Sequence, residues 1–290
     1  MKRYIAGLAC AATAVLSVPA LASTAHAQAA DPISALKSQF KNGRGVSYVD
    51  TTKVSSSYAK EVMAQRKGVL QFGASGISAS DQTTKLRIKA SDIAAISEDL
   101  SEEDAKMLAG LAKPERVIRI KNTSYVSGGI FGQFLPEGKN WLKMPGVLGN
   151  NGRVVQLVNP AEPATLKALL AHATVKRPTA YAGKITFGEL YKVSPWFRAG
   201  LFVPPNAKQA KTVVQWKLTL GSDQLARSLS TTYSGSALGA NGMNVTVETR
   251  YTGWGSKVTV KAPPADQIAK PNELGKGVDT EAPIPLLGAS

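Results

Sequence analysis

From residue 213 to residue 262 the chain alternates between apolar and polar side chains over several long runs. The first run is Val213 to Leu220, the turn residues Gly221-Ser222-Asp223 follow it, and further runs end at Pro263-Pro264. Alternation with a period of two is typical of strands with one buried and one solvated face, so this segment predicts an antiparallel meander. The apolar face of such a sheet needs a cover, either helices or a bound apolar ligand.

The N-terminus has the pattern of a secretory signal peptide. Lys2 and Arg3 precede an apolar run from Tyr4 to Leu21, and Ala25-His26-Ala27 is a small-x-small cleavage site. We therefore predict a signal peptide at residues 1–27 and an exported protein, secreted or in the extracytoplasmic cell envelope. Cys10 lies in a segment only loosely similar to a lipidation site, and we do not expect a lipid anchor there.

Cleavage would remove the chain's single cysteine, which excludes disulfides and thiol catalysis in the mature protein. It would also leave 33 basic against 20 acidic residues, a net charge of +13. These charges are spread along the chain, so we expect no nucleic-acid partner. For an exported protein, such a charge is typical either of a chain whose partner is a membrane surface or an anionic cell-wall polymer, or of one that uses charge only for solubility.

The rest of the chain mixes strands and helices without regular alternation, which indicates an antiparallel α+β domain. Asp31-Pro32 predicts the start of a helix, and so do Asp92, Ser101 and Asn159-Pro160. Strands are predicted at 46–54, 62–74, 77–80, 85–89, 116–121, 123–126, 140–144 and 179–187. Residues 189–201 have helical spacing but contain Pro195, so their structure stays open. We predict one domain over residues 28–269 and a disordered tail over 270–290, with a monomer as the expected state.

Residues for enzymatic chemistry are scarce. The mature chain keeps one histidine, His172, whose place at the end of a predicted helix suits the helix dipole better than catalysis. S-x-x-K matches, such as those at Ser34 and Ser57, would suit a penicillin-recognising serine enzyme, but its companion motifs are missing. We predict no enzyme activity, no metal site and no cofactor.

Several local patterns resemble the LolA/LppX-like carriers, including the LppX/LprG-type lipoproteins. Tyr125-Val126 and the later Asn140-Trp141-Leu142-Lys143 resemble paired strands of that family, and Gln215-Trp216-Lys217-Leu218 resembles the strand that opens its final meander. The most specific match is the segment from Tyr251 through Trp254-Gly255 to Pro263-Pro264. The resemblance covers most of the chain, from about Ile33 to Ile268.

The resemblance implies a strongly curved antiparallel half-barrel, covered by α-helices around an apolar cavity that takes acyl chains. It therefore implies a non-enzymatic carrier for lipids or lipidated molecules, each buried methylene contributing about 0.8 kcal/mol. Lys and Arg residues at the cavity mouth would meet an anionic head group. The candidate lining residues are large apolar side chains of the predicted strands and helices, which could equally fill a core: Leu70, Phe72, Leu108, Leu111, Trp141, Leu169, Phe187, Trp216 and Leu218.

A second hypothesis comes from charge alone. With its core filled, the same chain would be a cell-wall-associated interaction protein that binds anionic polymers through its net positive charge. High salt should release such a protein from its target, whereas a buried acyl chain should stay bound.

Overall fold

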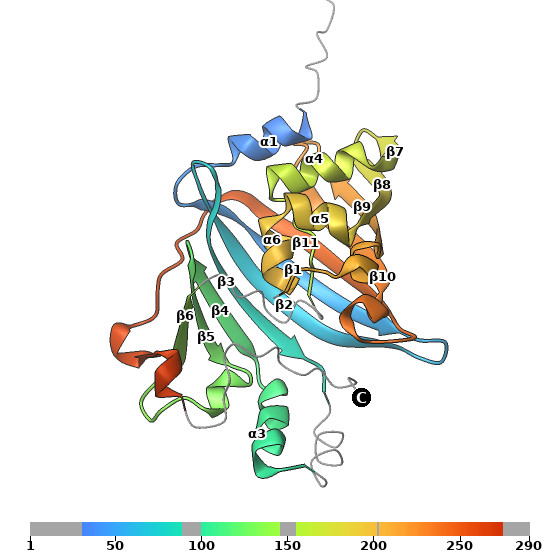
Figure 1. The fold of residues 1–290 in the computed structure, drawn as a ribbon. Helices are drawn as coiled ribbons and strands as arrows, with labels where there is room; N and C mark the ends of the chain where they lie inside the picture. The colour runs from blue at the N-terminus through green and yellow to red at the C-terminus, as the bar shows by residue number, and fades with distance from the viewer. Residues whose placement is uncertain (1–30, 89–99, 146–154, 202, 275–290) are drawn as a thin grey trace, which may run out of the picture.

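The computed structural model describes residues 31–88, 100–145, 155–201 and 203–274 (Figure 1). In these ranges the chain forms a sheet of twelve strands in the order β12-β6-β5-β4-β3-β2-β1-β11-β10-β9-β8-β7. Neighbouring strands are antiparallel, except that β12 runs parallel to β6. The strands are β1 (Arg44–Ser55), β2 (Lys60–Gly73), β3 (Gly76–Leu86), β4 (Glu115–Ile120), β5 (Thr123–Gly128), β6 (Trp141–Pro145), β7 (Ala173–Arg177), β8 (Ala180–Thr186), β9 (Val213–Leu220), β10 (Ala226–Ser234), β11 (Asn244–Lys257) and β12 (Ile268–Ala269).

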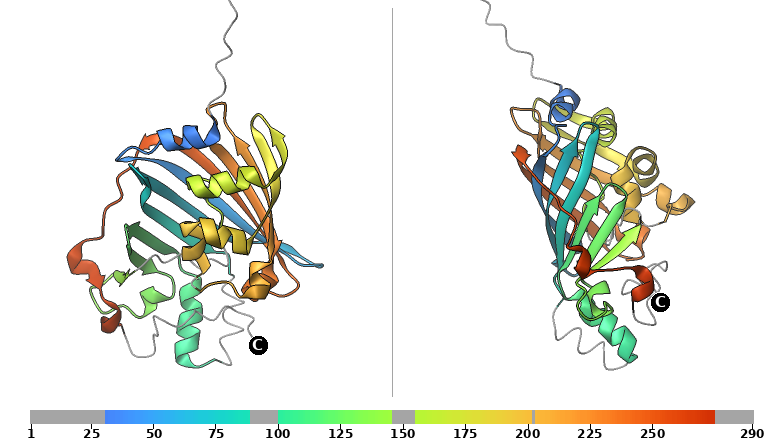
Figure 2. Two further views of the ribbon diagram at one scale, coloured as in Figure 1. Left: turned by 45° about the horizontal axis from the view of Figure 1, so that its top comes forward. Right: turned by 90° about the vertical axis from the view of Figure 1, so that its left-hand side faces the viewer.

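Helices cover one face of this sheet. Figure 2 shows that the sheet is twisted and curved, with α1, α4, α5 and α6 on one side of it and α3 beyond one end. The predicted fold class, an α+β protein with a curved antiparallel sheet covered by helices, is therefore confirmed. The helices are α1 (Pro32–Ser38), α3 (Glu102–Leu111), α4 (Pro163–Ala171), α5 (Phe187–Val193), α6 (Pro195–Leu201) and α7 (Ala207–Ala210).

The centre of the sheet joins the two ends of the chain. Strand β1 pairs with β2 on one side and with β11 on the other, so that Tyr48 lies opposite both Gly68 and Tyr251. The early strands and the C-terminal meander therefore share one continuous face.

The predicted meander is formed by β9, β10 and β11. Every second residue of β9 is buried, beginning with Val214 and ending with Leu220, as the sequence alternation requires. The alternating pattern continues beyond Lys257, but residues 258–260 are not part of the sheet. Gly253 and Gly255 have φ of 67° and 74°, a left-handed backbone that bends the end of β11, and the chain leaves the sheet after Lys257.

Local capping explains where several helices begin. The side chain of Asp31 accepts a hydrogen bond from the Ser34 amide (3.0 Å) at the start of α1. The open segment 189–201 consists of two helices, because Ser194 is extended and Pro195 begins α6.

Two predicted boundaries were wrong. The helix predicted from Asn159 begins at Pro163, which occupies its first turn. The strand predicted at 77–80 and the first two residues of the strand predicted at 85–89 belong to a single strand, β3. The signal peptide, the helix predicted at Asp92 and most of the predicted tail lie outside the described residues. At the start of that tail, Pro271–Glu273 form a short 3-10 helix.

Candidate functional site

The main apolar core lies between the meander and helices α4 to α6. Six of the nine predicted lining residues belong to it, and all six are almost fully buried: Leu70, Phe72, Leu169, Phe187, Trp216 and Leu218. The ring of Phe187 packs edge-on against Phe197 of α6 (5.1 Å between centroids) and against Tyr233 of β10 (5.4 Å). The helices therefore contact the sheet largely through aromatic and aliphatic side chains.

The other three predicted residues lie elsewhere. Leu108 and Leu111 of α3 form a separate small cluster with Ile130. Trp141 lies on the opposite face of the sheet, where the Arg116 guanidinium stacks on its indole ring (5.5 Å). The structure therefore brings six of the candidates together and separates three from them.

Two buried donors in the main core have no hydrogen-bond partner among the described residues. They are the indole Nε1 of Trp216 and the hydroxyl of Tyr233, whose side chains are 2% and 3% exposed. Trp216 pairs with Thr231, and Tyr233 follows two residues later on the same face, so the two side chains are diagonal neighbours about 7–8 Å apart at Cα. A buried polar group without a partner destabilises a protein by about 1–3 kcal/mol.

One carboxylate fastens helix α6 to the start of α4. Glu162 accepts hydrogen bonds from the Thr165 hydroxyl (2.8 Å), the Ser194 hydroxyl (2.5 Å) and the Trp196 amide (2.8 Å). Burial raises the pKa of Glu162, and these hydrogen bonds oppose that change. Since Ser194 and Trp196 flank Pro195, this acid holds the junction between α5 and α6.

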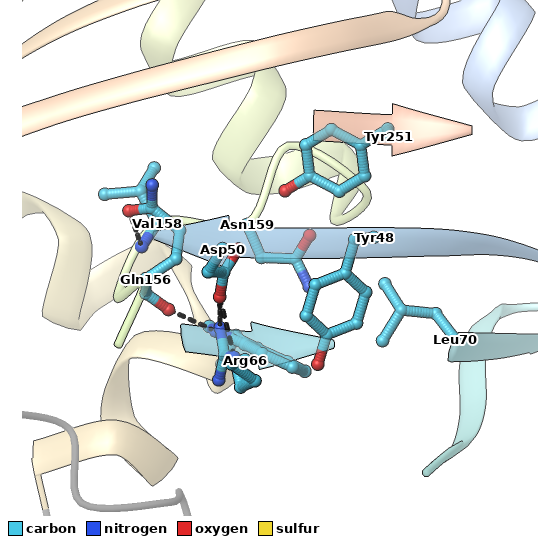
Figure 3. Close-up of a pocket in the computed structure, with 9 residues that line it drawn as sticks. Tyr48, Asp50, Arg66, Leu70, Gln156, Val158, Asn159 and Tyr251 are labelled. Atoms are coloured by element: carbon cyan, nitrogen blue, oxygen red, sulfur yellow. Dashed lines mark hydrogen bonds and ion pairs between the residues drawn. The ribbon is translucent and has the colours of Figure 1, made fainter. Parts of the chain in front are cut away.

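A polar pocket adjoins the apolar core, on the same face of β1 and β2 (Figure 3). Its centre is a buried ion pair in which the Nε of Arg66 donates to Oδ2 of Asp50 at 2.6 Å. The Arg66 guanidinium also lies over the rings of Tyr48 (5.2 Å) and Trp196 (5.6 Å). Burial alone would lower the pKa of Arg66, but the charge and hydrogen bond of Asp50, together with the nearby Tyr48 and Tyr251, outweigh burial and raise it. The pocket is lined by Tyr48, Asp50, Arg66, Leu70, Gln156, Val158, Asn159, Trp196 and Tyr251.

Gly68 of β2 shapes this pocket because it has no side chain. Tyr48, Gly68 and Gln82 lie in one row across β1, β2 and β3, and the Tyr48 hydroxyl donates to Oε1 of Gln82. To reach it, the Tyr48 ring crosses directly over Gly68, where an added Cβ would lie 2.8 Å from the ring. Glycine is needed here for close approach rather than for backbone freedom.

Two atoms at this pocket also have no partner among the described residues, Oδ1 of Asp50 and Nδ2 of Asn159. One is an acceptor and the other a donor, so a single water molecule suits both. The free space of the pocket is about 10 Å³, which is roughly the room for one water. In this conformation the pocket cannot hold an acyl chain.

The sequence prediction missed these polar residues. Asp50 and Arg66 lie on the buried face of their strands, together with Tyr48 and Leu70. A charged residue at a position that alternation predicts to be buried was the sequence feature that could have identified this pair.

The described residues contain no group of three or more histidine, cysteine or acidic side chains that could hold a metal. His172 is 41% exposed, with Nε2 3.5 Å from Glu189. Within the described part of the chain, no helix is long and apolar enough to span a membrane.

Glu115, on the same face of β4 as the pocket, makes stability depend on pH. Burial raises its pKa from an ordinary value of 4.5 to about 7, so between these values the folded chain keeps a proton that the unfolded chain releases. Stability should therefore fall as pH rises from 4.5 to 7. Glu115→Gln should remove this loss and be more stable than the parent at pH 8, by on the order of 1 kcal/mol because the side chain is only half-buried. Urea unfolding at pH 4.5 and pH 8 checks this, and an equal difference at both pH values would contradict it.

No protein-family model and no curated protein matches the chain. Similar solved structures include a hypothetical protein from Chlamydia trachomatis, with 11% identity, a TM-score of 0.30 and coverage of 81% of this chain and 98% of that one. A LolA superfamily protein from Nitrosomonas europaea has 5% identity, a TM-score of 0.29 and coverage of 81% and 94%. A DUF1329 family protein from Desulfovibrio piger has 6% identity, a TM-score of 0.28 and coverage of 76% and 90%. At TM-scores this low, no activity carries over from one protein to another.

Proposed function

We propose that this protein is an exported, non-enzymatic carrier that binds an acyl ester or fatty acid between its sheet and helices α4 to α6. The observation that carries the proposal is the pair of unpartnered donors, Trp216 Nε1 and Tyr233 Oη, within an otherwise apolar core. Oxygens of the carboxylate or ester group of an acyl ligand would accept from these donors. Its methylenes would replace the aromatic and aliphatic contacts that the helices now make.

The described conformation is the closed one in this proposal. Because the core is filled by side chains such as Phe187 and Phe197, a ligand can enter only if α5 and α6 move away from the sheet. The movement would break the hydrogen bonds that Ser194 and Trp196 donate to Glu162 and the bond from the Trp196 indole to the Gln156 carbonyl (3.0 Å). The buried Arg66–Asp50 pair borders the same core and would lie near the polar end of a bound amphiphile.

Native mass spectrometry with lipid extraction, on mature protein from its own secreting host, tests the proposal. A stoichiometric acyl lipid would support it and identify the cargo. Tyr233→Phe, which removes one donor and little volume, should bind a fluorescent fatty acid several-fold more weakly while unfolding at no lower denaturant concentration. A clean apo mass together with no fatty-acid binding would overturn the carrier function and leave a protein with a filled core.

A further inference from the structure

The outward face of the sheet, which lies opposite helices α4 to α6, carries a stripe of basic side chains. In the described structure, five exposed cations that lie in one row across the middle of this face have no ion-pair partner: Lys67, Lys85, Lys184, Lys217 and Arg250. The acids Asp81 and Glu248 share the face, but each already contacts a different cation, Arg116 (2.6 Å) and Lys53 (2.8 Å) respectively. The face therefore has an excess of positive charge.

Strand pairing arranges these five cations in order across the sheet. Val49 of β1 pairs with Lys67 on one side and with Arg250 on the other, so those two cations lie two strands apart, about 10 Å. Lys85 lies diagonally beyond Lys67 on β3. On the other side, Lys217 lies diagonally beyond Arg250 on β9, and Lys184 lies diagonally beyond Lys217 on β8. The stripe thus crosses from β3 to β8, over about 29 Å at the usual strand spacing.

The side chains between these cations are mostly small and hydroxylated. Arg250 pairs with Ser228, which pairs with Thr219, and Thr51 and Ser230 lie one step along the strands. Hydroxyl groups donate hydrogen bonds to phosphate and carboxylate oxygens. Because the residues are on paired strands, their spacing is fixed before any ligand binds.

The face favours a polymer over a bilayer or a nucleic acid. Its central strands have no aromatic side chain at the outward positions, whereas membrane-surface sites use Trp, Tyr or Phe and single-stranded nucleic acids stack on such rings. Val49, 52% exposed, is the apolar residue at the middle of the stripe and is too small to anchor in lipid. A flexible chain with repeated negative charges can follow the stripe from strand to strand.

We propose that the stripe of Lys67, Lys85, Lys184, Lys217 and Arg250 is a binding site for an anionic polymer with repeating phosphate or carboxylate groups. The site concentrates part of the positive charge of the chain on the face opposite the proposed acyl site. It does not depend on the carrier function, since it uses neither the apolar core nor any movement of the helices.

Charge reversal on each face of the molecule tests the site. The probe is end-labelled inorganic polyphosphate of defined length, and binding is followed by fluorescence anisotropy at low ionic strength. K67E/K217E/R250E should lower affinity at least about tenfold, because three exposed contacts become repulsive. The control K37E/K167E/K208E changes the net charge equally, but on α1, α4 and α7, and should lose less than about threefold.

Three results would overturn the proposal. The first is an equal loss of affinity in both variants, which would assign binding to net charge alone. The second is no loss of affinity in either variant. The third is stripe-dependent binding to phosphatidylglycerol vesicles that exceeds binding to the polymer. Added salt should weaken polyphosphate binding to the parent chain steeply. If the stripe variant does not fold, the neutral K85Q/K184Q/K217Q replaces it, with an affinity loss of several-fold expected.

Discussion

Arg66→Met is expected to destabilise the folded chain by about 3–5 kcal/mol, because it leaves the carboxylate of Asp50 buried without its counter-charge. One carboxylate oxygen of Asp50 already has no partner among the described residues, so the change would leave the whole group unsatisfied. The stacking of the guanidinium on Tyr48 and Trp196 would be lost as well. Chemical unfolding of the parent and the variant near neutral pH measures the difference.

The double variant Asp50→Leu/Arg66→Met separates an unpaired charge from a general packing defect. Replacing both partners by apolar groups removes the buried charge, so the double variant should be more stable than Arg66→Met alone. Arg116→Met, at a partly exposed ion pair with Asp81, should destabilise the chain far less, by about 1 kcal/mol or less. If the double variant lost at least as much free energy of unfolding as Asp50→Leu and Arg66→Met lose together, the pair would stabilise the fold by its geometry.

Sequence patterns were sufficient for much of the sheet because burial on one face enforces alternation. Val214, Trp216 and Leu218 are buried on β9 as their spacing requires, and Asp31 caps α1 as predicted. Strand order and register depend on pairings between distant segments, such as β1 with β11, and alternation alone does not specify them. A bulge between Thr52 and Lys53 also shifts the register of β1 and β2.

The candidate site illustrates both limits. Trp141 lies on the same face of β6 as the exposed Lys143, so alternation along the strand already placed it on the face away from the main core. Its large apolar side chain had nevertheless favoured a place in that core. The Asp50–Arg66 pair and the crossing of Tyr48 over Gly68 join residues on neighbouring strands, so they could be found only once the register was known. The unpartnered Tyr233 and Trp216 atoms likewise depend on what packs around them.

Phe197→Ala is expected to cost about 3–5 kcal/mol of stability and to gain much of it back when a medium-chain fatty acid is added. Phe197 is fully buried against Phe187, so its truncation leaves an apolar cavity between α6 and the sheet. An apolar cavity of this kind stays dry and takes up apolar ligands. A ligand at one hundred times its dissociation constant would restore about 2.7 kcal/mol, measurable as a shift of the thermal unfolding temperature with ligand concentration.

Leu142→Ala supplies the matched comparison. Leu142 is also fully buried, but it lies on β6, outside the core that α4 to α6 cover. This variant should lose about 2–5 kcal/mol without recovering stability when the fatty acid is added. Equal recovery in both variants would indicate non-specific uptake, and no recovery in Phe197→Ala would contradict an acyl site beneath α6. Recovery only in Phe197→Ala would locate the acyl chain beside Phe187 and Tyr233, where the carrier function requires it.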